Sequence, residues 1–361
     1  MRASLTQQTS TGQPLPSVSI CVPTYNGRKY LAECIKSIRR QTFTDFEVVV
    51  CDDQSSDGTL ELARHLAEDD SRFRFISNAR RLGLVGNWNN CIQLARGEWI
   101  KFVFQDDIIK PSCLETLLEA CRQTNSLFGF CEREFVFEEG VSMAAREWFE
   151  KHREEIRAEY QATPVIGLEQ AARIAFRKRM HNLVGEPTVT LINQTVFSDL
   201  GVFDEALVHM CDAEFWYRVM INRGAVFVPE RLAVFRVHKG ATTKVNMQER
   251  SFRTRVLDPV VLRHRFAFGR HFKPVRRFRV AGMSTLSRFG KHAIFAAHAW
   301  RDAKNALQSG DNSLMLEWCA VNKHCVGLKA IAWLGRGLEL IGWRKRMIPP
   351  DYSRSLERNN Y

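Results

Sequence analysis

The sequence predicts an α/β fold with a mostly parallel sheet, and the prediction starts from residues 18–51. A short apolar run at 18–22, rich in β-branched residues and ended by Pro23, is typical of a buried strand. Apolar residues at helical spacing follow at 30–38, and 46–51 forms a second predicted strand. Strand, helix and strand in this order make a βαβ unit, which requires parallel strands joined by a right-handed crossover.

A polar turn follows each of these two strands. The first reads Pro23-Thr24-Tyr25-Asn26-Gly27, and the second, at 52–59, reads DDQSSDGT. Because ligands of open α/β sheets bind beyond the carboxyl ends of the strands, we expect the chemistry at these turns. Asn-Gly and Asp-Gly are also ordinary turn formers, so a purely structural role is the alternative.

The pattern continues with alternating helices and strands. We expect a helix from Leu60 to about Asp69, a strand at 73–76, a helix at 87–95 and a strand at 98–104. Asp106 and Asp107 follow this last strand, so we expect them at the same edge of the sheet as the two polar turns. Adjacent carboxylates suit Mg²⁺ or Mn²⁺, which fill their remaining positions with phosphate oxygens and water. The alternative is a turn that only precedes the helix after Pro111.

The second half supplies further candidates. Charged residues dominate 135–164, which predicts a solvated helix or insertion, and 168–179 predicts another helix. Gly185-Glu186-Pro187 precedes a β-branched run at 188–192, a loop leading into a strand. A strand at 225–228 with a turn at Pro229-Glu230 precedes Phe235-Arg236-Val237-His238-Lys239-Gly240.

Asp212 opens a predicted helix whose apolar positions, Phe215, Trp216, Val219 and Met220, face the core. A carboxylate at a helix N-terminus can act as a base toward a hydroxyl group. It can equally be an N-cap, which is a common role for aspartate. Glu214, two residues on, is the second candidate for the base.

Composition bounds the class of protein. The chain has 361 residues with 45% hydrophobic and 25% charged residues, as in ordinary globular proteins, and no apolar run approaches the ~18 residues of a membrane span. Residues 1–16 are polar without a secretory signal, so we expect a disordered leader. Ten cysteines sit mainly in apolar patterns without a CxxC pair, which indicates a reducing cytoplasm.

The basic charge is concentrated in the tail. Residues 252–361 hold 21 Lys and Arg against 7 Asp and Glu, whereas 1–251 are almost balanced. Predicted basic helices with Trp333 and Trp343, and the run Arg344-Lys345-Arg346, fit an anionic membrane surface. Nucleic acid is the competing partner, but no recognisable nucleic-acid module accompanies the charge, so we expect none. A solvated helical subdomain packed on the core is the plain alternative.

The order and spacing of these motifs resemble the inverting glycosyltransferases of family 2, which have the GT-A fold. The likeness rests on VSICVPTYN, VVVCDDQSSDGT and NARRLGLVGNWNNCIQLARGEWIKFVFQDD, and continues with GEPTVTLI, LGVFDEAL, CDAEFWYRV and FRVHKGATT. It covers Val18 to Lys244, and the last four segments resemble the acceptor-side segments of bacterial members that build surface polysaccharides. It implies a nucleotide-diphosphate-sugar donor and a glycan or lipid-linked acceptor.

The resemblance also implies roles for single residues. Those with expected contacts to the nucleotide sugar are Pro23, Tyr25, Asn26, Asp53, Trp88, Asn89, Asp106 and Asp107. Asp106 matches the last aspartate of the DxD metal motif, whereas Phe104 replaces the first, and His238 matches a histidine that reaches the diphosphate or its metal. Asp212 matches the catalytic base, with Cys211 where glutamate is usual. The acceptor side would include Glu186, Glu214 and Trp216.

Together these observations predict an inverting glycosyltransferase that uses Mg²⁺ or Mn²⁺. We expect a leader at 1–16, a GT-A domain at 17–250 with a donor half at 17–110 and an acceptor half at 111–250, and a basic helical region at 251–361. The expected location is the cytoplasm or the inner face of the plasma membrane. Two alternatives remain: a catalytically degenerate scaffold that binds a nucleotide sugar or membrane, and a sugar-phosphate nucleotidyltransferase, for which PTYNGRKY is a poor phosphate loop.

Overall fold

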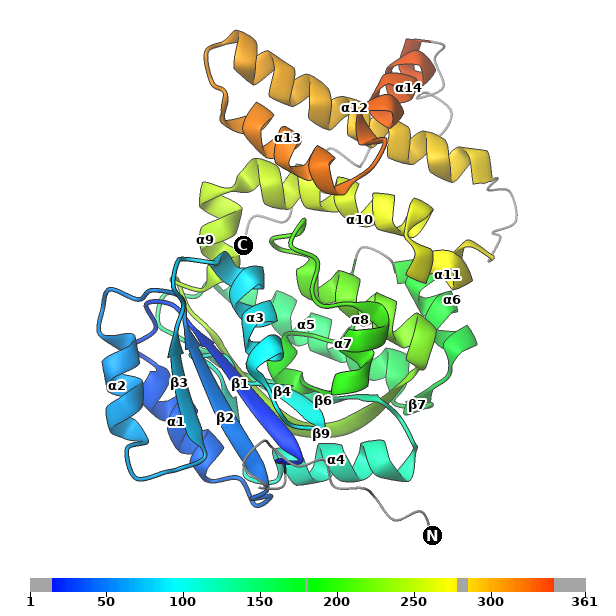
Figure 1. Ribbon diagram of the computed structural model, residues 1–361. Coiled ribbons are helices and arrows are strands. Elements are labelled where there is room, and N and C mark those ends of the chain that lie inside the picture. The colour runs from blue at the N-terminus through cyan, green and yellow to red at the C-terminus, as the bar shows by residue number, and fades with distance from the viewer. Residues whose placement is uncertain (1–14, 179–180, 278–284, 341–361) are drawn as a thin grey trace. The chain divides into compact units, whose positions relative to one another are not determined.

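The computed structural model describes residues 15–178, 181–277 and 285–340, which fall into two compact units. The first unit runs to Ala171 and takes in Asn182–Phe203 and Phe215–His238 (Figure 1). The second takes in Ala172–His181, Asp204–Glu214 and the chain from Lys239 onward. The units divide the chain differently from the predicted domains, because the segment 204–214 packs with the later helices.

The first unit is built on one mixed sheet of nine strands in the order β3-β2-β1-β4-β8-β6-β9-β5, with β7 paired to β9. Strands β3, β2, β1 and β4 are parallel to one another, as the βαβ pattern predicted. The predicted α/β class with a mostly parallel sheet is confirmed. The strands are β1 (Val18–Thr24), β2 (Phe46–Asp52), β3 (Phe73–Ser77), β4 (Trp99–Phe102), β5 (Ile108–Ile109), β6 (Phe128–Phe137), β7 (Val165–Ile166), β8 (Thr190–Asn193) and β9 (Ala225–Val237).

One predicted turn is wrong. Strand β9 continues through Pro229 and Glu230 instead of ending before them. Val228 pairs with Cys131, but the next pair joins Arg231 to Glu132, so the two residues between form a bulge. Proline lacks an N–H donor and is tolerated in a sheet at such irregular positions. The bulge allows one long strand to reach Val237, next to His238.

Helices follow and connect these strands along the chain. They are α1 (Leu31–Arg39), α2 (Thr59–Leu66), α3 (Gly83–Leu94), α4 (Cys113–Gln123), α5 (Met143–Tyr160), α6 (Leu168–Lys178), the short 3-10 helix η1 (Pro187–Val189), α7 (Gln194–Leu200) and α8 (Cys211–Arg223). Helices α1 and α2 lie beside each other, and α3 packs on β1 and β2. The charged region predicted as a helix or insertion forms the end of β6 and then α5.

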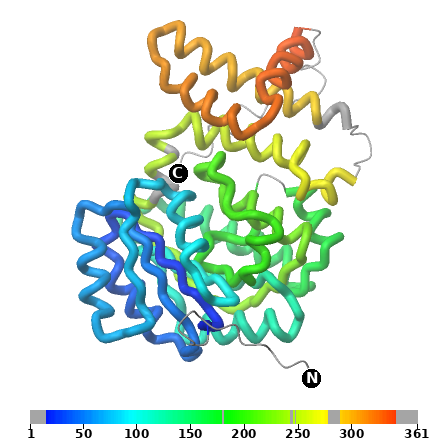
Figure 2. The backbone as a smooth tube through the Cα atoms, in the orientation of Figure 1, coloured from blue at the N-terminus to red at the C-terminus, as the bar shows by residue number. Residues whose placement is uncertain are grey.

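The second unit is helical. It contains α9 (Thr242–Glu249), a π-helical turn η2 (Arg253–Leu257), α10 (Asp258–Phe268), η3 (Arg270–Phe272), α11 (Lys273–Arg276), α12 (Thr285–Gln308), α13 (Ser313–His324) and α14 (Leu328–Leu340). Figure 2 traces α13 and α14 beside the long helix α12, which contacts both. A Cβ atom on Gly335 would lie 2.0 Å from the Ala293 carbonyl oxygen, so glycine permits the close approach of α14 to α12.

Some predictions fall outside the described residues. These are residues 1–14 of the expected leader, Trp343 and the basic run Arg344-Lys345-Arg346. Among the helices that the structure describes, none is both long and apolar enough to cross a membrane. All ten cysteines are free thiols, and nine of them are buried. They therefore act as small apolar residues, as their positions in apolar patterns suggested.

Candidate active site

The first two polar turns are bonded to each other at the carboxyl ends of β1 and β2. Asn26 has the positive φ of 46° that asparagine tolerates, and its backbone N–H donates to Ser55 Oγ at 2.9 Å. Ser56 N–H returns a bond to Asn26 Oδ1 at 2.9 Å, and Gly27 N–H donates to Thr59 Oγ1 at 2.9 Å. The two turns therefore form one preorganised edge, with the side chains of Tyr25 and Asn26 exposed.

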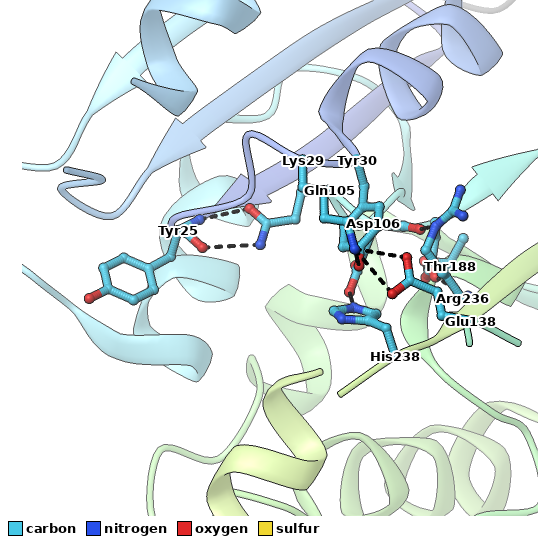
Figure 3. A network of polar contacts seen from close by, with 10 residues as sticks. Tyr25, Lys29, Tyr30, Gln105, Asp106, Glu138, Thr188, Arg236 and His238 are labelled. Atoms are coloured by element: carbon cyan, nitrogen blue, oxygen red, sulfur yellow. Dashed lines mark hydrogen bonds and ion pairs between the residues drawn. The ribbon is translucent and has the colours of Figure 1, made fainter. Parts of the chain in front are cut away.

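Gln105 joins this edge to the end of β4. Its Oε1 accepts the Tyr25 N–H at 2.9 Å, and its Nε2 donates to the Tyr25 carbonyl at 3.1 Å (Figure 3). A Cβ atom on Gly27 would lie 2.0 Å from Gln105 Oε1, so the amide occupies the space that this glycine leaves. Gln105 is not among the site residues predicted from the sequence. Its position inside the metal-motif tripeptide is the signal that could have identified it.

Asp106 and His238 meet although 132 positions separate them in the chain. Nε2 of His238 lies 3.0 Å from Oδ2 of Asp106. Arg236 holds the turn that carries Asp106. Its Nε donates to the Asp106 carbonyl at 3.2 Å, and its Nη2 donates to Glu33 at 2.8 Å. The Tyr30 ring lies 4.7 Å from the His238 ring and restricts its orientation. The structure thus brings together the two residues that the resemblance implied as metal ligands.

A second ion pair borders the same place. Lys29 Nζ lies 3.1 Å from Glu138 and donates to the Tyr30 hydroxyl at 2.7 Å (Figure 3). The hydrogen bond from Tyr30 is the main cause that lowers the pKa of Glu138. Sequence reasoning missed Lys29, Tyr30 and Glu138 as site residues, since each is an ordinary helix-start or strand-end residue until the fold places it beside His238.

Asp107 behaves differently from its neighbour. It is fully buried, accepts the Thr188 hydroxyl at 2.6 Å and the Arg236 N–H at 3.3 Å. Burial, followed by the charge of Asp106, raises the pKa of Asp107 well above its usual value. Thr188 also accepts the Phe104 N–H at 3.3 Å. Asp107 therefore anchors the turn to η1, and we omit it from the proposed donor contacts.

Asp53 is also buried, and its carboxylate holds the start of α3. Oδ1 accepts the Leu82 N–H at 2.7 Å and Asn78 Nδ2 at 2.9 Å, and Oδ2 accepts the Gly83 N–H at 2.8 Å. This is why α3 begins at Gly83, earlier than the predicted position 87. A carboxylate has several lone pairs, so the expected bond to a nucleotide base remains a prediction beside this anchoring role.

Trp88 and Asn89, which were expected to contact the nucleotide sugar, are both buried. Trp88 is 5% exposed and stacks on Phe104 with the ring centres 4.9 Å apart. Asn89 is 3% exposed, and its amide exchanges hydrogen bonds of 3.0 and 3.1 Å with the backbone of Phe203. Both side chains pack α3 against the rest of the unit, so we assign them a packing role.

The expected acceptor residues are divided between the two units. In the first unit Glu186 forms an ion pair at 3.1 Å with the buried Arg133, and Trp216 donates to the Gly185 carbonyl at 2.9 Å. Both contacts support the Gly185-Glu186-Pro187 loop. Asp212 and Glu214 belong to the second unit, where Asp212 is half-buried and Glu214 is buried. Oδ1 of Asp212 accepts the Ala213 N–H at 2.6 Å.

The donor set at Asp106 and His238 fits a divalent cation. The carboxylate oxygen and the imidazole nitrogen lie 3.0 Å apart in a hydrogen bond, and these are donor types that would both reach one Mg²⁺ or Mn²⁺ ion. Among the described residues, no three His, Cys, Asp or Glu side chains are grouped as a metal site. Mg²⁺ and Mn²⁺ fill remaining coordination positions with phosphate oxygens and water, which a bound nucleotide diphosphate would supply.

A mixed α/β sheet with preorganised polar turns at its strand ends and a carboxylate-imidazole pair beside them defines the class of GT-A glycosyltransferases. Residues 19–183 match the model of glycosyl transferase family 2. The chain is 30% identical over 244 residues to an uncharacterized protein of Mycobacterium tuberculosis, covering 67% of this chain and 73% of that protein. The chain belongs to glycosyl transferase family 2 and is a glycosyltransferase.

Relatives and solved structures agree with this assignment. A GalNAc(5)-diNAcBac-PP-undecaprenol beta-1,3-glucosyltransferase of Campylobacter jejuni is 37% identical over 119 residues, which cover 32% of this chain and only 38% of that enzyme. S. aureus TarS 1-349, solved with UDP-GlcNAc, has a TM-score of 0.55 at 18% identity, covering 86% of this chain and 81% of the TarS 1-349 chain. A Pyrobaculum calidifontis mannosyltransferase, solved with GDP-Man and Mn²⁺, has a TM-score of 0.51 at 17% identity, covering 90% and 87%. At these identities the two structures support the fold alone.

Proposed function

We propose that this chain is an inverting, cation-assisted glycosyltransferase that moves a sugar from a nucleotide-diphosphate sugar to a hydroxyl group of a glycan or lipid-linked acceptor. Its setting would be bacterial surface-polysaccharide synthesis. The observation that carries the proposal is the Asp106–His238 pair at 3.0 Å, next to the edge formed by Tyr25, Asn26 and Gln105. The names of the relatives, which include a glucosyltransferase acting on an undecaprenol-linked glycan, support the donor and acceptor classes.

In this proposal the exposed Tyr25 and Asn26, with Pro23 beneath them, bind the nucleotide. Asp106 and His238 would hold Mg²⁺ or Mn²⁺, and the bound cation would offset the negative charge of the departing diphosphate. Lys29 and Arg236, both beside the Tyr30 ring and each paired with a glutamate, would supply further cationic groups at the same place. The metal ion and the basic side chains would bind the diphosphate in place of a glycine-rich phosphate loop, a motif that the sequence lacks.

Asp212 is the proposed base. It would take the proton of the acceptor hydroxyl while that oxygen forms a bond to the anomeric carbon. The bond from the anomeric carbon to the diphosphate oxygen breaks on the opposite face, so the configuration inverts and the nucleoside diphosphate leaves with the bonding electrons. Asp212 is half-exposed in the first turn of α8, and this position supports its role as the base, since a base needs contact with substrate.

The experiment is a transfer and binding assay with a panel of UDP-, GDP- and dTDP-sugars, with and without Mn²⁺. We expect one nucleotide to raise the melting temperature in a Mn²⁺-dependent way. Asp212→Asn should then abolish transfer while the nucleotide Kd stays within about two-fold, because the variant loses only the proton acceptor. Transfer that survives in Asp212→Asn would reject this base. Retention of configuration in the product would reject inversion.

We also propose that the second unit binds an anionic lipid surface, where a lipid-linked acceptor would lie. Charge complementarity supports this partner, because the chain beyond residue 251 is strongly basic. Apolar side chains on and between α13 and α14 are exposed, namely Leu316, Val326, Trp333, Leu334 and Leu340. Vesicles with about 30% anionic lipid should retain the protein at low salt and release it at high salt. Equal binding to neutral vesicles would exclude the electrostatic contribution.

One observation favours a second candidate, a scaffold that binds a nucleotide sugar without turning it over. Phe104 replaces the first aspartate of the metal motif, and its ring stacks on Trp88. A cation site with one carboxylate fewer is expected to bind more weakly. Nucleotide binding without transfer or hydrolysis of any donor in the panel would support the scaffold.

A further inference from the structure

The segment 204–210, which leads into α8 and Asp212, is held by charged residues of the later helices of its own unit. Figure 2 shows this green segment beside the yellow-green start of α10. The carboxylate of Asp258 is fully buried and accepts three consecutive backbone N–H groups, those of Val208 at 3.0 Å, His209 at 2.6 Å and Met210 at 3.1 Å. One carboxylate thus determines the path of the chain immediately before Cys211.

Two arginines complete the arrangement. Arg253, which is 5% exposed, donates from Nη2 to the Ala206 carbonyl, and its Nε lies 3.5 Å from Asp258 Oδ1. Arg265 donates to Asp204 Oδ2 at 2.6 Å and, through Nη1, to the His324 carbonyl at 3.0 Å. The segment is therefore held at its start by Arg265, in its middle by Arg253 and at its end by Asp258.

The contacts of Asp258 with 208–210 are buried and charged, unlike those of an ordinary surface loop. Buried carboxylates are costly unless they are paired or fully hydrogen-bonded. Burial raises the pKa of Asp258, and the three N–H groups and Arg253 act in the opposite direction. A fully buried charge that satisfies three main-chain donors favours one loop conformation, because any other conformation would break these three hydrogen bonds at a buried carboxylate.

We infer that Asp258, assisted by Arg253, is a positioning residue for sugar transfer: it sets the backbone of 208–210 and through it the first turn of α8, which carries Asp212. The inference rests on the proposed role of Asp212. It also assigns a purpose to the start of the basic helical region, which would be part of the catalytic machinery in addition to any role at a membrane. Because Asp258 acts through another residue, it should affect the rate of the proton-transfer step and leave donor binding unchanged.

The test is Asp258→Asn, which keeps the shape of the side chain but turns an NH₂ group toward backbone donors. We expect kcat to fall about 10- to 100-fold, as misplacement of a catalytic group does, while KM for the donor and Kd for the nucleotide change less than about two-fold. Hydrogen exchange at the Val208, His209 and Met210 amides should quicken at least about ten-fold. Arg253→Gln should show the same pattern with a smaller loss.

A matched control separates positioning from general destabilisation. Ile294→Ala removes a buried side chain of α12 in the same unit and lowers the melting temperature without altering the contacts of 204–210. We expect its kcat at about 25 °C to stay within about two-fold of the parent. An unchanged kcat in Asp258→Asn, or a loss that Ile294→Ala matches at equal melting temperature, would overturn the inference.

The double variant distinguishes this inference from the proposed function. If Asp258 acts through Asp212, adding Asp258→Asn to Asp212→Asn should cause no further loss of the residual rate. A further loss of about ten-fold would mean that Asp258 acts by another route. An active Asp212→Asn would refute the proposed base whatever Asp258→Asn does, whereas an inactive Asp212→Asn beside a fully active Asp258→Asn would refute only the positioning role.

Discussion

Nε2 of His238 lies 3.0 Å from Oδ2 of Asp106, although 132 positions separate the two residues in the chain. Asp106 follows the parallel strand β4, and His238 follows β9, which stands farther along the same sheet. Arg236 supports this contact, because its Nε donates a hydrogen bond from the end of β9 to the Asp106 carbonyl. Two strand ends thus supply one donor each to a site that neither could form alone.

This relationship predicts that both residues contribute to cation affinity. His238→Asn should raise the Mn²⁺ concentration needed for half-maximal nucleotide binding about ten-fold or more, because one of two protein ligands is lost. Asp106→Asn should remove the Mn²⁺ dependence altogether. Calorimetric titration of Mn²⁺ with nucleoside diphosphate measures both. The exposed neighbour Lys239→Gln is the control, and an unchanged Mn²⁺ requirement in His238→Asn would show that the histidine has another role.

Gln105 should govern how firmly the nucleotide edge is held. Gln105→Ala removes both hydrogen bonds to the Tyr25 backbone, and we expect the nucleotide Kd to rise about five- to ten-fold, equivalent to roughly 1 kcal/mol. Gly27→Ala should weaken binding similarly, since its Cβ would overlap the Gln105 amide. Titration of each variant with the nucleoside diphosphate measures the change in Kd.

The double variant tests whether Gln105 and Gly27 act as a unit. Once the amide is removed by Gln105→Ala, the methyl group that Gly27→Ala introduces has space, so the two losses should not add. A double variant whose loss equals the full sum of the single losses would indicate that Gly27→Ala acts by altering the backbone of the turn.

Asp53→Asn should destabilise the first unit. The buried carboxylate of Asp53 accepts hydrogen bonds from the N–H groups of Leu82 and Gly83 at the start of α3. In Asp53→Asn the NH₂ group of the amide would face one of these N–H donors, and that hydrogen bond would be lost. We expect the free energy of unfolding to fall by about 1.5–3 kcal/mol, measured by urea titration. Asp69→Asn is the control, because this carboxylate of the same unit is 67% exposed and pairs with Arg39 at the surface. A fully stable Asp53→Asn with weakened nucleotide binding would favour the base contact over the anchoring role.

The second unit should lose stability in acid because of two buried histidines. Burial lowers the pKa of His264 to about 4 and that of His292 to about 3, with the nearby charge of the other histidine adding to the effect at His292. In the unfolded chain both titrate near about 6.5. The unfolded state therefore binds more protons below about pH 6.5, so stability is fully present above that pH and declines as the pH falls toward about 4.

The slope should not exceed about 1.4 kcal/mol per pH unit for each histidine. His292→Leu should flatten the decline, while His65→Leu, which changes an exposed histidine of the first unit, should not. Unfolding by urea between about pH 7 and about pH 5 measures this slope. A decline of equal steepness in His292→Leu would show that carboxylates, and not the histidine pair, determine the acid sensitivity.

The strands and helices of the first unit were largely readable from local patterns, because burial imposes a period of two or about 3.6 residues on the sequence. Val18–Val22 and Leu31–Ile38 lie in elements of the predicted type. Pro229 shows where a local rule failed: it predicts a turn, but pairing with β6 accommodates it as a bulge. The resemblance to known motifs identified the family, and Asp106 and His238 as partners.

The sequence by itself determined the α/β class, the family and the residue types available at the strand ends. Only the tertiary structure decided which of these side chains are exposed and which are buried in structural contacts, because burial depends on contacts between residues distant in the chain. Asp106 and Asp107 are adjacent and chemically identical, yet one meets His238 and the other is buried against Thr188. In the same way Asp258 could not be connected with the segment 208–210 until the chain brought its carboxylate to three backbone N–H groups, since hydrogen bonds across such separations leave no local pattern.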